Sequence, residues 1–299
     1  MKRKLIISML MCLVPWTVHA SSAVWPTQPI TIIVPYSPGG LTDQIARTLS
    51  LEIEKETQQS VLIKYMPGGT NLVALNHAAR MENNDHTFVL TMDDFILGPM
   101  NQDSTIYRKF NGVYVTSFLP FVVVTKDPSK AQITKNQTKI NLAVVGTNSA
   151  ADLWAKSLSG ISVNSVAYKG AAPAITDLLG GHIDYGVFSI GVIKTYIDDG
   201  KLHPVMVSSA RRSNKLPKTP TATELGFRGT DSITWFAFIA RDDTSETALK
   251  GFSSMLQRIH VSKAPLKFLS ERGAEVVNWD LDRSRRFVED QKKNFESQK

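Results

Sequence analysis

The feature that most constrains the fold is a unit that recurs along the chain: a short apolar run, a turn containing glycine, and an amphipathic helical pattern. In the first helical pattern Ile45, Leu49 and Ile53 lie four residues apart and therefore share one helix face. Alternating strands and helices of this kind predict a parallel sheet covered by helices on both faces. In the first third of the chain we predict strands at 29–35, 61–66 and 87–92, and helices at 42–58 and 71–81.

The same unit restarts after a polar stretch at 127–139, which predicts a second lobe of α/β type. The apolar segments at 118–125 and 233–240 are predicted to be strands, the first of them crossing into the second lobe. We expect one lobe from residues 25–122 and about 232–299, and a second from residues 123–231. The other predicted strands are 140–145, 161–168, 183–188 and 204–209, and the other predicted helices are 150–159, 174–179, 244–260 and 284–296.

Residues 1–20 have the composition of a cleavable signal peptide. A basic start precedes a mostly apolar stretch, and Val18, His19 and Ala20 resemble a signal-peptidase site. The apolar stretch is shorter than the roughly 20 residues that a membrane span needs. We therefore expect a mature protein in the periplasm. It would lack cysteine, because Cys12 lies in the leader, and so would have no disulfide or thiol chemistry.

The charge and the scattered polar residues exclude several classes of function. The formal net charge of +7 falls to about +4 when the three basic residues of the leader are removed. This small excess suits an anionic ligand, but no basic patch interleaved with aromatic residues predicts nucleic-acid binding. The histidines lack metal-ligand spacing, and there is no GxSxG or Walker-type sequence. We expect no enzyme activity, no metal and no cofactor.

Three glycine turns each follow a strand and precede a helix, at 35–43, 66–71 and 144–152. In open α/β sheets, ligands bind outside the carboxyl ends of the strands, where helix N-termini offer free N–H groups to anions. Thr42 or Asp43 is predicted to cap the first of these helices. A single turn of this composition also suits any connection between strand and helix. Three of them predict a pocket for a negatively charged group between the lobes.

The segments WPTQPITIIVPYSPGGLTDQIAR at 25–47 and YKGAAPAITDLLGGHID at 168–184 resemble the tripartite tricarboxylate transporter receptor family, the Bug-type periplasmic solute-binding proteins. Shorter matches are YMPGG at 65–69, RSNKLP at 212–217 and TPT at 219–221. The resemblance implies a type II periplasmic-binding-protein fold, in which two α/β lobes close over a small carboxylate in the cleft between them. It implies no cofactor and no metal.

The resemblance also implies which residues line the cleft. The first turn would hold one ligand carboxylate, and the first helix of the second lobe would hold another. The implied ligand-binding residues are Tyr36, Ser37, Gly39, Gly40, Thr42, Asp43, Pro67, Gly68, Gly69, Thr70, Thr91, Asp93, Gly146, Thr147, Asn148, Ser149, Tyr168, Lys169, Gly170, Ala171, Ala172 and Asp184.

The chain departs from the family pattern at several positions. Asn148 replaces a glycine, and Asp152 stands where a histidine is usual; we expect Asp152 on the outer face of its helix. Asp93 and Asp94 stand where small hydroxyl residues are usual, and they either favour a ligand with an amine or cap a helix. Lys169 either neutralises a bound anion or is solvated.

The implied function is capture of a small organic carboxylate, such as a di- or tricarboxylate, by a monomeric receptor. The receptor would deliver this ligand to the membrane subunits of a tripartite tricarboxylate-type transporter. The alternative is a sensor component that docks on the periplasmic domain of a sensor kinase, because both roles need the same closing cleft. A member that no longer binds is a third possibility.

Overall fold

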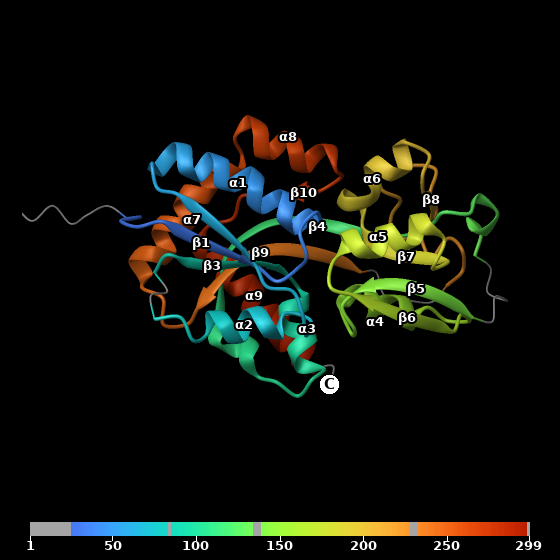
Figure 1. The fold of residues 1–299 in the computed structure, drawn as a ribbon, viewed down its shortest axis with the longest axis horizontal. Coiled ribbons are helices and arrows are strands. Elements are labelled where there is room, and N and C mark those ends of the chain that lie inside the picture. Colours follow the sequence, from blue (N-terminus) through green and yellow to red (C-terminus); the bar gives the residue numbers. More distant parts are fainter. Residues whose placement is uncertain (1–24, 83–84, 134–138, 228–231, 298–299) are drawn as a thin grey trace, which may run out of the picture.

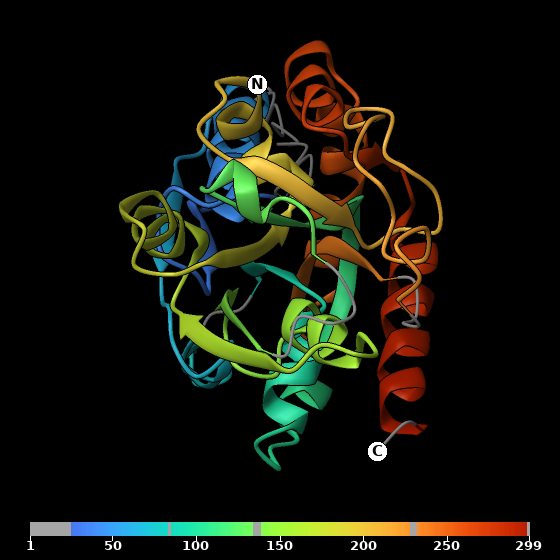
Figure 2. The same ribbon diagram turned by 90° about the vertical axis from the view of Figure 1, so that its right-hand side faces the viewer.

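The computed structural model describes residues 25–82, 85–133, 139–227 and 232–297. The predicted leader at 1–20 lies outside these residues. Two groups of strands and helices lie side by side, and paired strands run from one group into the other (Figure 1). Figure 2 views the molecule from the side of the second group. We call these groups the first and the second lobe.

The first lobe combines elements from both ends of the described chain. The helices α1, α7 and α8 cover one face of its sheet, and α2, α3 and α9 cover the other (Figure 1). Its elements are β1 (Ile30–Val34), α1 (Leu41–Thr57), β2 (Val61–Tyr65), α2 (Leu72–Ala78), β3 (Thr87–Met92), α3 (Asp94–Met100), the 3₁₀ turn η1 (Ile106–Lys109), β9 (Ile233–Arg241), α7 (Glu246–His260), α8 (Lys263–Glu271), β10 (Glu275–Val276) and α9 (Leu281–Ser297).

The second lobe is built from one continuous part of the chain, with α5 and α6 on one face of its sheet and α4 on the other (Figure 1). Its elements are the 3₁₀ turn η2 (Pro128–Lys130), β5 (Ile140–Val145), α4 (Ala150–Ser157), β6 (Val163–Tyr168), α5 (Ala171–Gly180), β7 (Tyr185–Ser189), α6 (Ile190–Asp198) and β8 (His203–Val207).

The strand β4 (Phe110–Thr125) belongs to both lobes. It pairs antiparallel with β9 over 110–120 and with β7 over 121–125. The strand order is β2-β1-β3-β9-β4-β7-β5-β6, and β8 and β10 also pair with β4. The change of partner after Pro120 supports our proposal that the lobes divide near residues 122 and 232.

The burial of each strand follows from its position in the sheet. The strand β1 lies between β2 and β3 and its sequence ITIIV is almost fully buried, as expected of a strand covered on both faces. The edge strand β2 instead alternates, with Leu62 and Lys64 exposed. The carboxyl ends of β1, β3, β5 and β7 lie at the junction of the lobes. The turns that follow these strands therefore reach the site.

The predicted strands and helices are present, and the differences have local causes. The strand β4 begins at Phe110 rather than at 118. The predicted start is too late because Gly112 interrupts the apolar pattern before residue 118. A Cβ atom at Gly112 would lie 2.6 Å from Val288 Cγ2, so glycine allows α9 to pack closely there. The helices α3, α6 and α8 were not predicted. The first turn of α6 is apolar and resembles a strand.

Candidate functional site

The turn between β1 and α1 leaves a helix N-terminus open. The helix α1 begins at Leu41 with Gly40 at the N-cap position, and no side chain of the described residues caps it. Gly39 has a φ of +92°, which favours glycine, and its N–H donates to Asp43 Oδ2 at 2.7 Å. The prediction that Thr42 or Asp43 caps α1 is wrong, because both lie inside its first turn. The first N–H groups of α1 are therefore available to a ligand.

Asp43 fixes this turn from within the first lobe. Its buried carboxylate accepts hydrogen bonds from Arg47 Nε at 2.7 Å and from the Tyr65 hydroxyl at 2.5 Å, in addition to the Gly39 N–H. Hydrogen bonds to a charged acceptor are stronger than neutral ones, so these donors hold the turn in one conformation. These hydrogen-bond partners of the Asp43 carboxylate all belong to the first lobe.

Tyr36 is held by a small buried network. Its hydroxyl lies 3.3 Å from Thr91 Oγ1 and 3.4 Å from Asn71 Nδ2, and Thr91 donates to Asn71 Oδ1 at 2.7 Å. Burial raises the pKa of Tyr36 well above its ordinary value, and Asp94 raises it further. The ring is therefore a fixed neutral wall at the junction of the lobes.

Hydrogen bonds join the two lobes directly. The Ser37 N–H donates to the Lys169 carbonyl at 3.1 Å, and the Thr70 hydroxyl donates to the Thr147 carbonyl at 3.1 Å. Both bonds end on main-chain groups of the second lobe, and the Lys169 side chain is exposed. The structure is therefore a closed conformation in which the first-lobe turns touch the second lobe.

Close packing of small residues makes this contact possible. A Cβ atom at Gly170 would lie 2.9 Å from both Ser37 N and Ser37 Cβ, which is shorter than real Cβ contacts. A Cβ atom at Gly39 would lie 3.3 Å from Ala172 Cβ. The turns at 36–40 and 168–172 meet so closely that a side chain at Gly170 would separate them.

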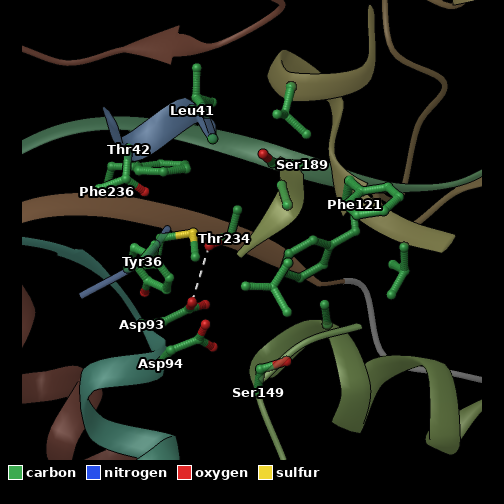
Figure 3. A pocket seen from close by; sticks show the side chains of 18 residues that line it. Tyr36, Leu41, Thr42, Asp93, Asp94, Phe121, Ser149, Ser189, Thr234 and Phe236 are labelled. Carbon is green, nitrogen blue, oxygen red and sulfur yellow. Dashed lines mark hydrogen bonds between the residues drawn. The ribbon is translucent and has the colours of Figure 1, made fainter. Parts of the chain in front are cut away.

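Between the lobes lies a small cavity of about 50 Å³, which we call the interlobe pocket (Figure 3). This volume is below that of ordinary small-molecule sites, so the lobes lie close together around the pocket in this conformation. Both lobes supply its walls, which are mostly apolar with a few hydroxyl and carboxyl groups. The lining residues are Tyr36, Gly40, Leu41, Thr42, Met92, Asp93, Asp94, Phe121, Val145, Ser149, Ala151, Ala171, Val187, Phe188, Ser189, Val192, Thr234 and Phe236.

A second and larger hollow, which we call the outer hollow, has a volume of about 400 Å³. It shares Tyr36 and Val145 with the interlobe pocket. It is lined by Pro35, Tyr36, Gly68, Gly69, Thr70, Asn71, Gln102, Val145, Gly146, Thr147, Asn148, Ala167, Tyr168 and Lys169.

The residues implied by the resemblance divide between these cavities. The interlobe pocket receives Tyr36, Gly40, Thr42, Asp93, Ser149 and Ala171. The outer hollow receives Tyr36, Gly68, Gly69, Thr70, Gly146, Thr147, Asn148, Tyr168 and Lys169. Neither is lined by Ser37, Gly39, Asp43, Pro67, Thr91, Gly170, Ala172 or Asp184.

Asp184 lies at the opposite end of the second lobe from the pocket. It precedes β7, whereas the pocket is lined by residues 187–189 at the other end of that strand. Its carboxylate accepts hydrogen bonds from Lys130 and Asn141, and the bond from Lys130 holds the pKa of Asp184 below its ordinary value. This carboxylate has local partners and does not face the cleft.

Sequence reasoning missed the apolar walls of the interlobe pocket. Phe121, Val187, Val192 and Phe236 lie on strands and a helix whose patterns predict only core positions. It also missed Thr234, whose hydroxyl donates to Asp93. One indication was that Phe121, Thr234 and Phe236 lie in the apolar segments at 118–125 and 233–240.

Asp93 and Asp94 are buried together at the pocket. Asp93 is 4% exposed and accepts a hydrogen bond from the Thr234 hydroxyl at 3.0 Å, while Asp94 is 3% exposed. Burial, then the charge of Asp94, raises the pKa of Asp93 well above its ordinary value. Burial likewise raises the pKa of Asp94 to about 7, against the lowering effect of the hydrogen bond from Ala150 N–H. Asp93 occupies the N-cap position of α3, but its side chain makes no capping bond within the described structure.

The start of α4 is satisfied by protein groups. Asp94 Oδ1 accepts from Ala150 N–H at 3.0 Å across the lobes, and Ser149 Oγ accepts from Asp152 N–H at 3.3 Å. Asp152 Oδ2 accepts from Asn148 N–H at 2.7 Å. The expectation that Asp152 lies on the outer face of the helix is wrong: it is 0% exposed and also accepts from the Ser165 hydroxyl.

Two other helix N-termini face the interlobe pocket. The helices α5 and α6 have Gly170 and Ser189 at their N-cap positions, and neither has a side-chain cap from the described residues. Ala171 and Ser189 line the pocket. The pocket is thus surrounded by partly positive helix ends, which attract an anionic group without a basic side chain.

The described residues also bear on metal binding and on membrane spanning. Among them, no cluster of three or more His, Cys, Asp or Glu side chains is arranged to hold a metal ion. Within the same ranges, no helix has both the length and the apolar character to cross a membrane.

Two α/β lobes that share a long strand and enclose a pocket define the periplasmic-binding-protein class, here of type II. The particular family follows from the sequence: residues 45–297 match the model of the "Tripartite tricarboxylate transporter family receptor", and the chain belongs to this family. Its members are solute-binding receptors, so the chain is a binding protein and not an enzyme.

Relatives with curated names are similar over most of their length. Protein BugT of Bordetella pertussis is 26% identical over 287 residues, which cover 91% of this chain and 88% of BugT. A protein encoded in the ttuE-ttuC' intergenic region of the TAR-I region of Agrobacterium vitis is 26% identical, covering 90% of this chain and 82% of that protein.

Solved structures show the same fold. The R. palustris protein Rpa4515 with adipate has a TM-score of 0.82 at 24% identity, covering 91% of this chain and 96% of that one. MatC from Rhodopseudomonas palustris with bound malate has a TM-score of 0.79 at 21% identity, covering 91% and 99%. The periplasmic binding protein BugD has a TM-score of 0.79 at 23% identity, covering 91% and 98%.

Proposed function

We propose that this receptor captures a small organic carboxylate in the interlobe pocket. The observation that carries the proposal is the uncapped N-terminus of α1, whose residues Gly40, Leu41 and Thr42 line the pocket opposite Ala171 of α5. Helix ends bind carboxylates through N–H groups and the helix dipole. Relatives of the same fold hold adipate and malate, which are organic acids, and this supports the same ligand class here.

The ligand would stabilise the closed form because both lobes contact it. Closure follows when a ligand binds the closed conformation better than the open one. The bonds from Ser37 to Lys169 and from Thr70 to Thr147 form only when the lobes meet, so they add to the closed state. An equilibrium between open and closed forms lets a receptor close on its ligand and release it later.

The partner we propose is the pair of membrane subunits of a tripartite tricarboxylate-type transporter. Membership of the receptor family supports this role, and the leader predicted at residues 1–20 supports export to the periplasm. The receptor would deliver the acid by docking in its closed form.

A thermal-shift screen of the protein from about residue 21 tests the proposal. The panel holds mono-, di- and tricarboxylates, aromatic acids, nicotinate and amino acids. An acid present at about 1,000 times its Kd adds about 4 kcal/mol of stability, which raises the melting temperature clearly. Folded protein, freed of any co-purified ligand by unfolding and refolding, that responds to no carboxylate would contradict the proposal.

A further inference from the structure

The interlobe pocket has two chemically different ends. In the view of Figure 3, Leu41, Thr42 and Ser189 lie at one end, which is formed by the start of α1 and the start of α6. A Cβ atom at Gly40 would lie 3.9 Å from Ala171 Cβ, so the start of α5 meets the start of α1 at this end. Three helix N-termini without side-chain caps from the described residues therefore converge where one carboxylate can bind.

At the other end of the pocket Figure 3 shows Asp93, Asp94 and Ser149. The helix α4 begins here, but side chains of the protein already accept hydrogen bonds from its Ala150 and Asp152 N–H groups. Asp94 Oδ1 accepts from Ala150 N–H, a contact between residues 56 positions apart that links the lobes. A carboxyl group of the protein thus occupies the place at this helix end that a ligand carboxylate would need.

The charges around the acid end also disfavour a second ligand carboxylate. No Lys, Arg or His is among the described residues that line the interlobe pocket. Burial already raises the pKa values of Asp93 and Asp94, which means that this end stabilises negative charge poorly. Between the two ends the walls are apolar, with Met92, Phe121 and Val187 among the lining residues.

We propose that the pocket takes an organic acid with a single carboxylate, and that Asp94 excludes a second carboxylate by occupying the N-terminus of α4 itself. The carboxylate binds at the ends of α1, α5 and α6, and the body of the ligand lies along the apolar walls. The far end of the ligand is neutral or carries an amine. This inference rests on the proposed function and names its ligand class.

Matched acids test this inference with the wild-type protein. Isothermal titration compares hexanoate, adipate and 6-aminohexanoate, together with the corresponding sets of four and eight carbons. Each set contains two acids with one carboxylate, one of them with a neutral far end and the other with an amine. In every set that shows binding, we expect the tighter of these two acids to have a Kd at least about tenfold below that of the dicarboxylate, because like charges placed together at a binding site are unfavourable. Equal or tighter binding of the dicarboxylates would overturn the inference and leave the proposed function intact. Failure of every acid to bind folded protein would overturn both.

Two substitutions test the role of Asp94. Asp94→Asn removes the charge but keeps an oxygen that can accept from Ala150 N–H, whereas Asp94→Ala also frees that N–H. We expect the ratio of dicarboxylate to monocarboxylate affinity to rise in Asp94→Asn and to rise further, about tenfold or more, in Asp94→Ala. Asp184→Asn removes a carboxylate outside the pocket and should leave the ratio unchanged. An unchanged ratio in both Asp94 variants, with native circular dichroism, would overturn the role of Asp94.

Discussion

Replacing Gly170 by alanine should hinder closure of the lobes without harming either lobe. The backbone at Gly170 is extended, with a φ of 174°, so alanine fits the local conformation. The added methyl group meets the opposite lobe, at 2.9 Å from both Ser37 N and Ser37 Cβ. Since the obstacle belongs to the other lobe, it matters only when the lobes are together.

The expected magnitude follows from these distances. Ordinary contacts of a Cβ atom begin at 3.4 Å, so the two turns must separate by about 0.5 Å. This separation weakens or breaks the 3.1 Å hydrogen bond from Ser37 N–H to the Lys169 carbonyl, which is worth about 1 kcal/mol. With the strain of overpacking, the closed state loses about 1–3 kcal/mol, and the Kd for the ligand rises about 5- to 150-fold.

Titration calorimetry with an acid found in the thermal-shift screen measures the change in Kd, and small-angle scattering measures closure on adding it. The melting temperature of the ligand-free variant should stay near that of the wild type, because the open form has no clash. Thr176→Ala, an exposed change on the same helix α5, is the matched control. Wild-type affinity in Gly170→Ala, or an equal loss of stability with and without ligand, would refute this reasoning.

Three other changes test the framework around the site by denaturant unfolding. Asp43→Ala should cost about 1.5–3 kcal/mol, because the Gly39 N–H and the other donors lose a charged acceptor, and Asp43→Asn should cost less; equal losses would contradict the role of charge. Gly112→Ala should cost about 1–3 kcal/mol, since its Cβ would lie 2.8 Å from the Ser284 carbonyl oxygen, and an unchanged stability would mean that α9 can shift freely. Burial lowers the pKa of His260 from 6.5 to about 4. Because the folded pKa is the lower one, the stability that this residue contributes is present above about pH 6.5 and is lost as the pH falls through 4, by about 3 kcal/mol in total. His260→Gln should lose that much less stability than the wild type between about pH 7 and pH 4, and parallel curves would contradict this sign.

Most of the fold could be predicted because its signals are local. A strand, a glycine turn and an amphipathic helix follow one another over a short stretch of chain, as from Ile30 to Thr57, and the turns lie at the strand ends as expected. The connection by β4 and β9 was visible as two apolar runs. Among the helices that the sequence did not show is α6, because its first turn, beginning at Ile190, resembles a buried strand and only the contacts of the fold make it a helix.

The candidate site was predictable only in part. Motifs placed Tyr36 and Ala171 at the pocket, because glycine-rich turns are recognisable in the chain itself. The partner of Asp94 lies 56 positions away at Ala150, and such a contact has no local pattern. For the same reason Asp152 was misplaced: a carboxylate at the start of a helix reaches inward when neighbouring N–H groups lack partners, and one sequence does not reveal which do.

The position of β9 has a consequence for how the chain folds during synthesis. This strand lies between β3 and β4 in the middle of the first lobe, although it comes from residues 233–241. A nascent chain that ends before this segment has unpaired edges on β3 and β4, which are sites for association with other chains. The second lobe, being continuous in sequence, can assemble earlier, since domains fold as units when their residues are complete. The lobe that begins the chain is therefore the last to be finished.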